Sequence, residues 1–264
     1  MPKRKILISI FSILVLLTFC VPIFIRQAYV VPILMYHSVK PDAPPQDRLI
    51  VSVSTFERQM RFLRKNRYNV IPLQQLAELI KEKRRIPPRT VSITLDDGYK
   101  DNYVYAYPIL KRYNIIATIF LIVNEVGRPD RLSWDEIAEM QDSGIVFFGS
   151  HTLGPEPLTN IKSDTQLKSE IFDSKQILQE KLKVKVGAFS YPEGRFNAKI
   201  RQMVIDAGYS VAVGTNPGRG YPNDDIFALK RIRISETSRN TLVFWLQTSG
   251  LYTFIKEHRH HSHK

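Results

Sequence analysis

The chain has 264 residues, of which 44% are hydrophobic and 24% are charged, with 12 Gly and 16 Pro. This composition excludes a disordered or fibrous chain, and the length fits one α/β domain with a sizeable core. A single cysteine, Cys20, excludes an intramolecular disulfide and a cysteine-rich zinc site. The net charge is +13, and the part after residue 28 carries +9 of it. No helix-turn-helix, zinc-finger or basic-aromatic pattern accompanies that charge, so we exclude nucleic acid as a partner and interpret the surplus as solvated surface charge.

An uncharged, mostly apolar run of 20 residues, 6–25, follows the basic Lys3, Arg4 and Lys5. At about 1.5 Å per residue it spans a hydrocarbon core of about 30 Å, so residues 1–28 are predicted to be a transmembrane anchor. Basic residues in front of a span stay in the cytoplasm, which places the rest of the chain on the outer side of a cell membrane. A cleaved signal peptide, giving a secreted protein, is the alternative, although no A-x-A-like cleavage site is present. Lipid modification at Cys20 is disfavoured, because the bulky Phe19 precedes it.

After residue 28, apolar runs typical of buried strands alternate with helical patterns. The expected strands cover residues 30–36, 90–95, 117–123, 145–149, 187–190, 211–214 and 228–234. The expected helices cover residues 73–83, 103–113, 134–143, 164–182 and 198–207, and a further helix begins at a capping box of Ser54 and Glu57 after a Pro-rich loop, 40–48. Unbroken apolar strands between helices predict a parallel sheet with helices on its outer face, and about seven such units predict a closed or nearly closed barrel.

Polar residues follow four of the expected strands. His37 ends the first strand, Asp96 and Asp97 end the second, and His151 ends a later one. A Tyr-Pro-Glu-Gly turn, 191–194, follows another strand. The carboxyl ends of parallel barrel strands meet at one rim, so these side chains are expected to converge there.

Two adjacent carboxylates can take two different chemical roles. One of them, with a histidine, suits a divalent cation such as zinc, while the other stays free as a base. A metal-activated water, a carboxylate base and a histidine acid can hydrolyse an amide without a nucleophilic Ser or Cys. The alternative is structural: Asp96 and Asp97 only cap the helix that begins after Gly98.

Several motifs, in order, resemble those of the polysaccharide deacetylases, the NodB-homology or carbohydrate esterase 4 group. They are TLDDG at 94–98, LSW at 132–134, GSHTLGPEPLT at 149–159, FSYPEG at 189–194 and LKRIRI at 229–234. VPILMYHSV at 31–39 resembles the opening of the branch that acts on poly-N-acetylglucosamine. The resemblance covers about residues 30–235 and implies a distorted (β/α)7 TIM-like barrel. It also implies metal-dependent hydrolysis of N-acetyl groups on an extracytoplasmic poly-N-acetylglucosamine or peptidoglycan-like glycan.

The resemblance implies a role for each matching residue. Asp96 is the general base, while Asp97 and His151 are metal ligands. His37 is the general acid, because the position that carries this histidine in many members is occupied here by Lys230 and Arg231. 

The same resemblance implies residues around the substrate. The backbone N–H of Glu193, after Pro192, is expected to hold the oxyanion. Tyr191, Trp134 and Tyr99 are candidates for stacking on sugar rings near the rim, with core packing the favoured interpretation for each ring taken alone.

One departure from the family pattern concerns the metal. The second metal histidine of the family falls at Pro155 or Glu156. We expect Glu156 to supply an oxygen ligand instead, completing an Asp97–His151–Glu156 set for Zn²⁺. The alternative is a catalytically impaired protein that binds envelope glycan. The domains are therefore expected to be 1–28 (anchor), 29–255 (deacetylase-like domain) and 256–264 (flexible His-rich tail).

Overall fold

The computed structural model describes residues 29–44, 46–215 and 221–259. The predicted anchor, 1–28, and the last five residues of the predicted tail lie outside these ranges. Within them, none of the helices combines the length and the apolar character needed to cross a membrane.

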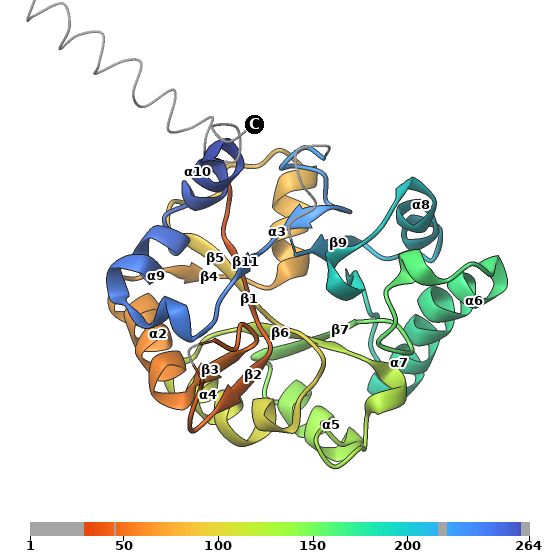
Figure 1. The fold of residues 1–264 in the computed structure, drawn as a ribbon, viewed down its shortest axis with the longest axis horizontal. Helices are drawn as coiled ribbons and strands as arrows, with labels where there is room; N and C mark the ends of the chain where they lie inside the picture. Colours follow the sequence, from red (N-terminus) through yellow and green to blue (C-terminus); the bar gives the residue numbers. More distant parts are fainter. Residues whose placement is uncertain (1–28, 45, 216–220, 260–264) are drawn as a thin grey trace, which may run out of the picture.

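The described residues form a nearly closed barrel of parallel strands (Figure 1). In spatial order from β10, the strands are β10 (Leu229–Lys230), β9 (Val211–Gly214), β8 (Ala188–Ser190), β7 (Val146–Ser150), β6 (Ala117–Leu121), β5 (Thr90–Leu95), β1 (Ile33–Tyr36) and β11 (Ile232–Arg233). Only Arg231 separates β10 from β11, which pair with β9 and β1 respectively. The segment from β10 to β11 therefore joins the two edges of the sheet, and the predicted parallel α/β barrel is confirmed.

Helices cover the outside of the barrel (Figure 1). They are α2 (Val53–Lys65), α3 (Leu73–Lys81), α4 (Tyr107–Tyr113), α5 (Trp134–Asp142), α6 (Asp164–Lys168), α7 (Ser174–Leu182) and α8 (Ala198–Asp206). Strands β1, β5 and β6 are buried at every position. Burial on both faces explains why their sequences show no polar alternation.

The start of α2 differs from the prediction. Its N-cap is Ser52, whose side chain accepts a hydrogen bond from the Thr55 N–H, and not Ser54. Glu57 does not complete a capping box, because its carboxylate binds Arg112 and the Tyr113 hydroxyl. The capping box that does form joins Ser133 and Glu136 at the start of α5.

Other local features were not predicted. Short strands β2 (Ser38–Lys40) and β3 (Ile50–Ser52) form a separate parallel pair, and β4 (Asn69–Val70) adds to β5. The helix expected over 164–182 is interrupted by a π-helical turn, Ser169–Asp173, and the one over 103–113 begins with another, Asn102–Ala106. Two- and three-residue strands carry too little periodicity to be recognised in a sequence.

Two further helices follow the barrel, α9 (Thr241–Thr248) and α10 (Tyr252–Arg259). Phe244 of α9 is buried against Phe62 of α2, with 5.7 Å between ring centroids. α10 continues four residues past the expected domain end at 255, and Glu257 within it pairs with the buried Lys230. The first part of the predicted flexible tail is thus helical.

Candidate active site

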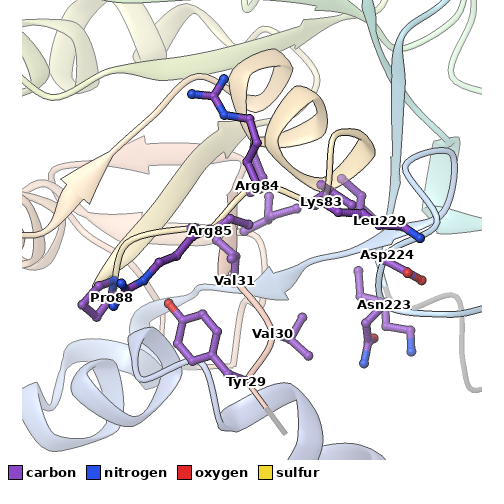
Figure 2. A pocket seen from close by; sticks show the side chains of 15 residues that line it. Tyr29, Val30, Val31, Lys83, Arg84, Arg85, Pro88, Asn223, Asp224 and Leu229 are labelled. Atoms are coloured by element: carbon purple, nitrogen blue, oxygen red, sulfur yellow. The ribbon is translucent and has the colours of Figure 1, made fainter. Parts of the chain in front are cut away.

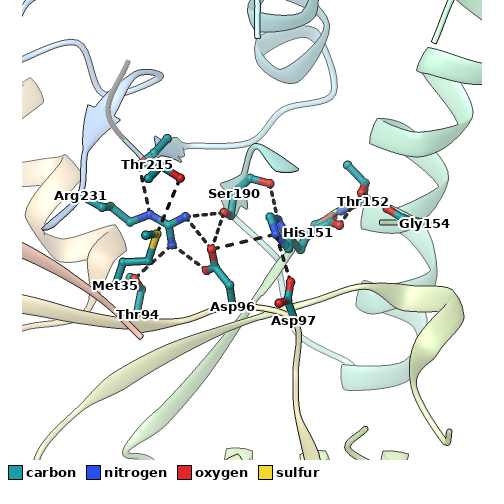
Figure 3. A network of polar contacts seen from close by, with 12 residues as sticks. Met35, Thr94, Asp96, Asp97, His151, Thr152, Gly154, Ser190, Thr215 and Arg231 are labelled. Carbon is teal, nitrogen blue, oxygen red and sulfur yellow. Dashed lines mark hydrogen bonds and ion pairs between the residues drawn. The ribbon is translucent and has the colours of Figure 1, made fainter. Parts of the chain in front are cut away.

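The rim formed by the carboxyl ends of the strands collects the polar residues that the sequence singled out. Asp96 and Asp97 follow β5, His151 follows β7, and His37 follows β1. Figure 3 shows Asp96 between Arg231 on one side and His151 on the other, with Asp97 below the histidine. The predicted convergence on one rim is observed.

Asp96 is clamped by Arg231, a residue for which the sequence analysis proposed no role. The Arg231 Nη1 and Nη2 atoms donate to Oδ1 and Oδ2 of Asp96 at 2.6 and 2.7 Å. Arg231 also donates to the Ser190 hydroxyl, the Thr94 hydroxyl and the Gly214 carbonyl. Two parallel charge-assisted hydrogen bonds fix both the charge and the plane of the carboxylate.

This clamp sets the protonation state of Asp96. Burial alone would raise the pKa of the carboxyl group, but the facing guanidinium and the histidines outweigh burial and hold the pKa well below its usual range. Asp96 therefore stays ionised although only 2% of it is exposed. A carboxylate with four lone-pair directions keeps acceptor capacity beyond the two bonds to Arg231.

Asp97 and His151 face each other, and 3.5 Å separates Asp97 Oδ1 from His151 Nε2. The other ring nitrogen of His151, Nδ1, lies 2.7 Å from the Ser190 carbonyl oxygen, which only accepts. Nδ1 therefore donates to this carbonyl, and Nε2 is the ring nitrogen that faces Asp97. A backbone carbonyl that accepts from one ring nitrogen and so orients the ring is the usual support of a metal-binding histidine.

The backbone is turned sharply at this point. Asp97 has φ +70° and Thr152, after His151, has φ +69°, a left-handed conformation that costs a non-glycine residue about 1 kcal/mol or more. Gly98 continues the turn at φ +61°, where a Cβ would lie 2.7 Å from Leu121. Such strain, at the carboxyl ends of β5 and β7, is typical of a functional rim rather than of simple helix capping.

His37 is packed beside the two aspartates. Burial lowers the pKa of its imidazole, whereas the charges of Asp96 and Asp97 oppose that change. Its Nδ1 is buried and has no hydrogen-bond partner within the part of the chain that the structure describes. Its backbone carbonyl accepts a hydrogen bond from Asn102, which holds the segment after β1 in place.

The loop after His151 carries the altered metal motif. Pro155 and Glu156 are both exposed, and Glu156 Oε1 accepts a hydrogen bond from Asn160. Glu170 holds the loop by accepting hydrogen bonds from the backbone N–H groups of Leu153 and Gly154 at 2.9 Å. In the described ranges, no three His, Cys, Asp or Glu side chains form a group arranged to bind a metal. Glu156 as a third ligand therefore stays a prediction.

The residues of the turn expected to contact substrate differ in their exposure. Tyr191 is fully buried, stacks on Phe196 and donates to the Phe227 carbonyl, so core packing, the interpretation favoured for its ring, is the observed one. Pro192 is buried too, whereas Glu193 is exposed at φ +54°. The next residues, Gly194 and Arg195, donate the hydrogen bonds that close the turn.

Trp134 opens α5 and is partly buried against the core, with Lys181 Nζ 5.7 Å from its ring centroid. Tyr99 lies beside Asp97, and burial together with the carboxylate charge raises its pKa to about 12. The Tyr99 ring is covered by the Arg131 guanidinium at 4.2 Å.

Asp97 and His151 present donor atoms of the kind that a divalent cation requires. An imidazole nitrogen and a carboxylate oxygen 3.5 Å apart are donor types suited to Zn²⁺, and the carboxylate of Asp96 lies 4.0 Å from the same nitrogen. Asp97 and His151 fit the cation as two of its ligands. Asp96 is less suited, because Arg231 already neutralises it.

Comparison with known proteins identifies the family. A sequence profile described as "Polysaccharide deacetylase" matches residues 83–212. The putative polysaccharide deacetylase YxkH of Bacillus subtilis is 34% identical over 204 residues, which cover 77% of this chain and 71% of YxkH. The chain belongs to the polysaccharide deacetylase family. Its members include a poly-beta-1,6-N-acetyl-D-glucosamine N-deacetylase of Staphylococcus aureus (strain MRSA252), 30% identical over 205 residues, 73% of this chain and 70% of that protein.

A solved structure agrees with this assignment. The Streptococcus pyogenes deacetylase PplD, in complex with acetate, superposes with a TM-score of 0.75 at 29% identity, covering 83% of this chain and 98% of PplD. This polysaccharide deacetylase thus shares its fold with the deacetylase PplD over most of its length. The sequence resemblance stated from the motifs is confirmed.

Proposed function

We propose that this polysaccharide deacetylase hydrolyses N-acetyl groups of an extracytoplasmic glycan in a metal-dependent reaction. The observation that carries the proposal is the pairing of Asp96 with Arg231 directly beside the Asp97–His151 pair. One carboxylate is held ionised by a buried guanidinium, and the other faces the Nε2 atom of His151. Helix capping alone requires neither arrangement.

The roles of the chain's own residues follow from this geometry. Asp97 and His151 hold the cation, with Glu156 as the proposed third ligand. The cation, when bound, acidifies a water molecule and polarises the acetamide carbonyl. Asp96 accepts the proton of that water, since its carboxylate lies 4.0 Å from the ligand nitrogen and its pKa is held well below the usual range.

Two further groups act on the leaving amine and on the oxyanion. His37 lies within the fields of both aspartates and donates a proton to the leaving amine. The Glu193 N–H, presented by a left-handed turn, is the proposed donor to the oxyanion. Trp134 is the proposed ring contact to a sugar.

The substrate class and the location belong to the same proposal. Poly-N-acetylglucosamine is the favoured glycan, because a relative 30% identical to this chain is named as its N-deacetylase; peptidoglycan-like chains are the second choice. Residues 1–28 are proposed to anchor the chain in the cell membrane with the barrel outside. The apolar run 6–25 behind three basic residues supports this orientation.

Zinc stoichiometry tests whether the altered metal motif still works. We expect about one tightly bound Zn²⁺ per chain and a loss of affinity of at least about tenfold in Glu156→Ala. The measurement is elemental analysis after dialysis, in a full-length background in which the tail histidines are alanine. Glu180→Ala, another carboxylate on the surface, is the matched control and should bind zinc normally. No zinc in the parent chain would favour the impaired, glycan-binding alternative.

A further inference from the structure

The amino end of β1 lies at the opposite end of the barrel from the active site. Tyr29, four residues before β1, is fixed there, because the Val30 N–H donates to the Gly250 carbonyl at 2.8 Å. The Tyr29 ring lies so close to Gly250 that an added Cβ would come within 2.1 Å of it. The place at which the chain enters the domain is therefore defined by contacts with the α9–α10 junction.

An open cavity of about 1080 Å³ lies beside Tyr29. Its wall is mainly apolar and includes Val31, Leu76 and Ile80. Its margin carries basic residues, and Figure 2 shows Arg85 alongside Val31 and Tyr29, with Arg84 farther out. An apolar hollow with a basic margin suits an amphiphile that has an anionic head.

The basic margin belongs to the exposed segment that follows α3. Residues 81–89 contain five basic side chains and one acid, Glu82. Lys83, Arg84 and Arg85 in this segment all line the cavity and are all exposed. Basic residues held near an anionic bilayer are attracted to its surface.

On the other side of Gly250, α9 exposes large apolar side chains. Leu242 is 74% exposed and Trp245 is 53% exposed, three residues apart on one face of the helix. Phe244 and Thr248 occupy the buried face. An outward face of Leu and Trp is typical of helices that lie in a membrane interface.

The reach of the chain connects these features to a bilayer. The predicted span ends at residue 25, four residues before Tyr29. Four residues extend at most about 14 Å. We propose that the surface around Tyr29, made of Lys83, Arg84, Arg85 and the exposed face of α9, docks onto the anionic phospholipid headgroups of the anchoring membrane. The inference rests on the proposed anchoring of residues 1–28.

Docking at this surface orients the enzyme. The active site follows the carboxyl ends of the strands, whereas Tyr29 precedes the amino end of β1. The site then opens away from the bilayer, toward polymers that lie farther out in the envelope. Lys83, Arg84 and Arg85 take no part in the chemistry, so they set the position of the site and not its reaction.

The two tryptophans of the chain, Trp134 and Trp245, provide an internal probe and control. The full chain is reconstituted in vesicles with brominated acyl chains, either phosphatidylcholine alone or mixed with phosphatidylglycerol. Trp134→Phe leaves only Trp245, and Trp245→Phe leaves only Trp134. We expect roughly twofold quenching of Trp245 in the anionic vesicles, little in the neutral ones, and little quenching of Trp134 in either.

The charge-reversed variant Lys83→Glu/Arg84→Glu/Arg85→Glu should lose the quenching of Trp245. Asp135 is exposed on α5, outside the proposed docking surface. Asp135→Lys is therefore the control for a change of charge elsewhere and should keep the quenching of Trp245. Equal quenching of Trp245 in neutral and anionic vesicles, or unchanged quenching in the triple variant, would overturn the docking. Washing the vesicles with carbonate separates the proposed anchoring from the proposed docking. If the wash removes the chain from the vesicles, both proposals are overturned. If the chain stays in the vesicles but Trp245 is not quenched, the docking alone is overturned.

Discussion

Arg231→Met is expected to lower kcat/KM by at least about a hundredfold, because Asp96 loses the group that keeps it ionised. The free energy of unfolding should fall by about 3–5 kcal/mol, the usual cost of leaving one member of a buried ion pair alone. Acetate release and urea denaturation are the measurements. Asp96→Asn/Arg231→Met, which removes both charges, is the matched control and should be more stable than Arg231→Met.

The same substitution changes the response to pH. In the parent protein the pKa of Asp96 lies below its unfolded value of about 3.9. Asp96 therefore contributes stability that is present above that pH and is lost as the pH falls toward the folded pKa. Without Arg231, burial raises the pKa of Asp96, so the acid limb of the rate profile should move to higher pH. An unchanged profile and an unfolding free energy within about 1 kcal/mol of the parent would contradict the clamp.

The two adjacent aspartates should respond differently to the same isosteric change. Asp96→Asn is expected to lower turnover by at least about a thousandfold and to leave zinc bound, because it removes the base and not a ligand. Asp97→Asn should lose zinc affinity by at least about tenfold and lose activity with it. Turnover and bound zinc are measured on the same preparations.

Opposite results would reverse the assignment. Loss of zinc in Asp96→Asn with zinc retained in Asp97→Asn would make Asp96 the ligand. Near-ultraviolet circular dichroism establishes that each variant is folded, and Asp96→Asn/Arg231→Met separates loss of the base from the stress of an unpaired Arg231.

The barrel was predictable because its strands follow a simple physical rule. Strands buried on both faces are continuously apolar, and β5 and β9 coincide with the runs expected at 90–95 and 211–214. The N-cap of α2 was misplaced by two residues, since Ser52 and Ser54 are equally good caps in sequence. The helices α9 and α10 were missed because α9 exposes apolar residues and so lacks an amphipathic pattern.

Much of the site was predictable from residues at the ends of strands, but its electrostatics were not. Asp96, Asp97 and His151 were predicted because residues at the carboxyl ends of barrel strands converge on one rim. Arg231 was noted only as a position at which other family members carry a histidine. A signal was present: LKRIRI was expected to be a buried strand, and a guanidinium buried within it requires a carboxylate. Which carboxylate it meets depends on barrel closure between β10 and β11, a contact between residues 135 positions apart.

Acetate release from poly-N-acetylglucosamine by the full chain tests the central claim most directly. The chain is assayed as isolated, after removal of divalent cations by a chelator, and after zinc is returned, with Asp96→Asn as the blank. We expect release that the chelator abolishes and zinc restores, and none from the blank. Zinc-loaded protein that releases no acetate from poly-N-acetylglucosamine, peptidoglycan or chitin oligomers, or release that the chelator leaves unchanged, would contradict a metal-dependent N-deacetylase.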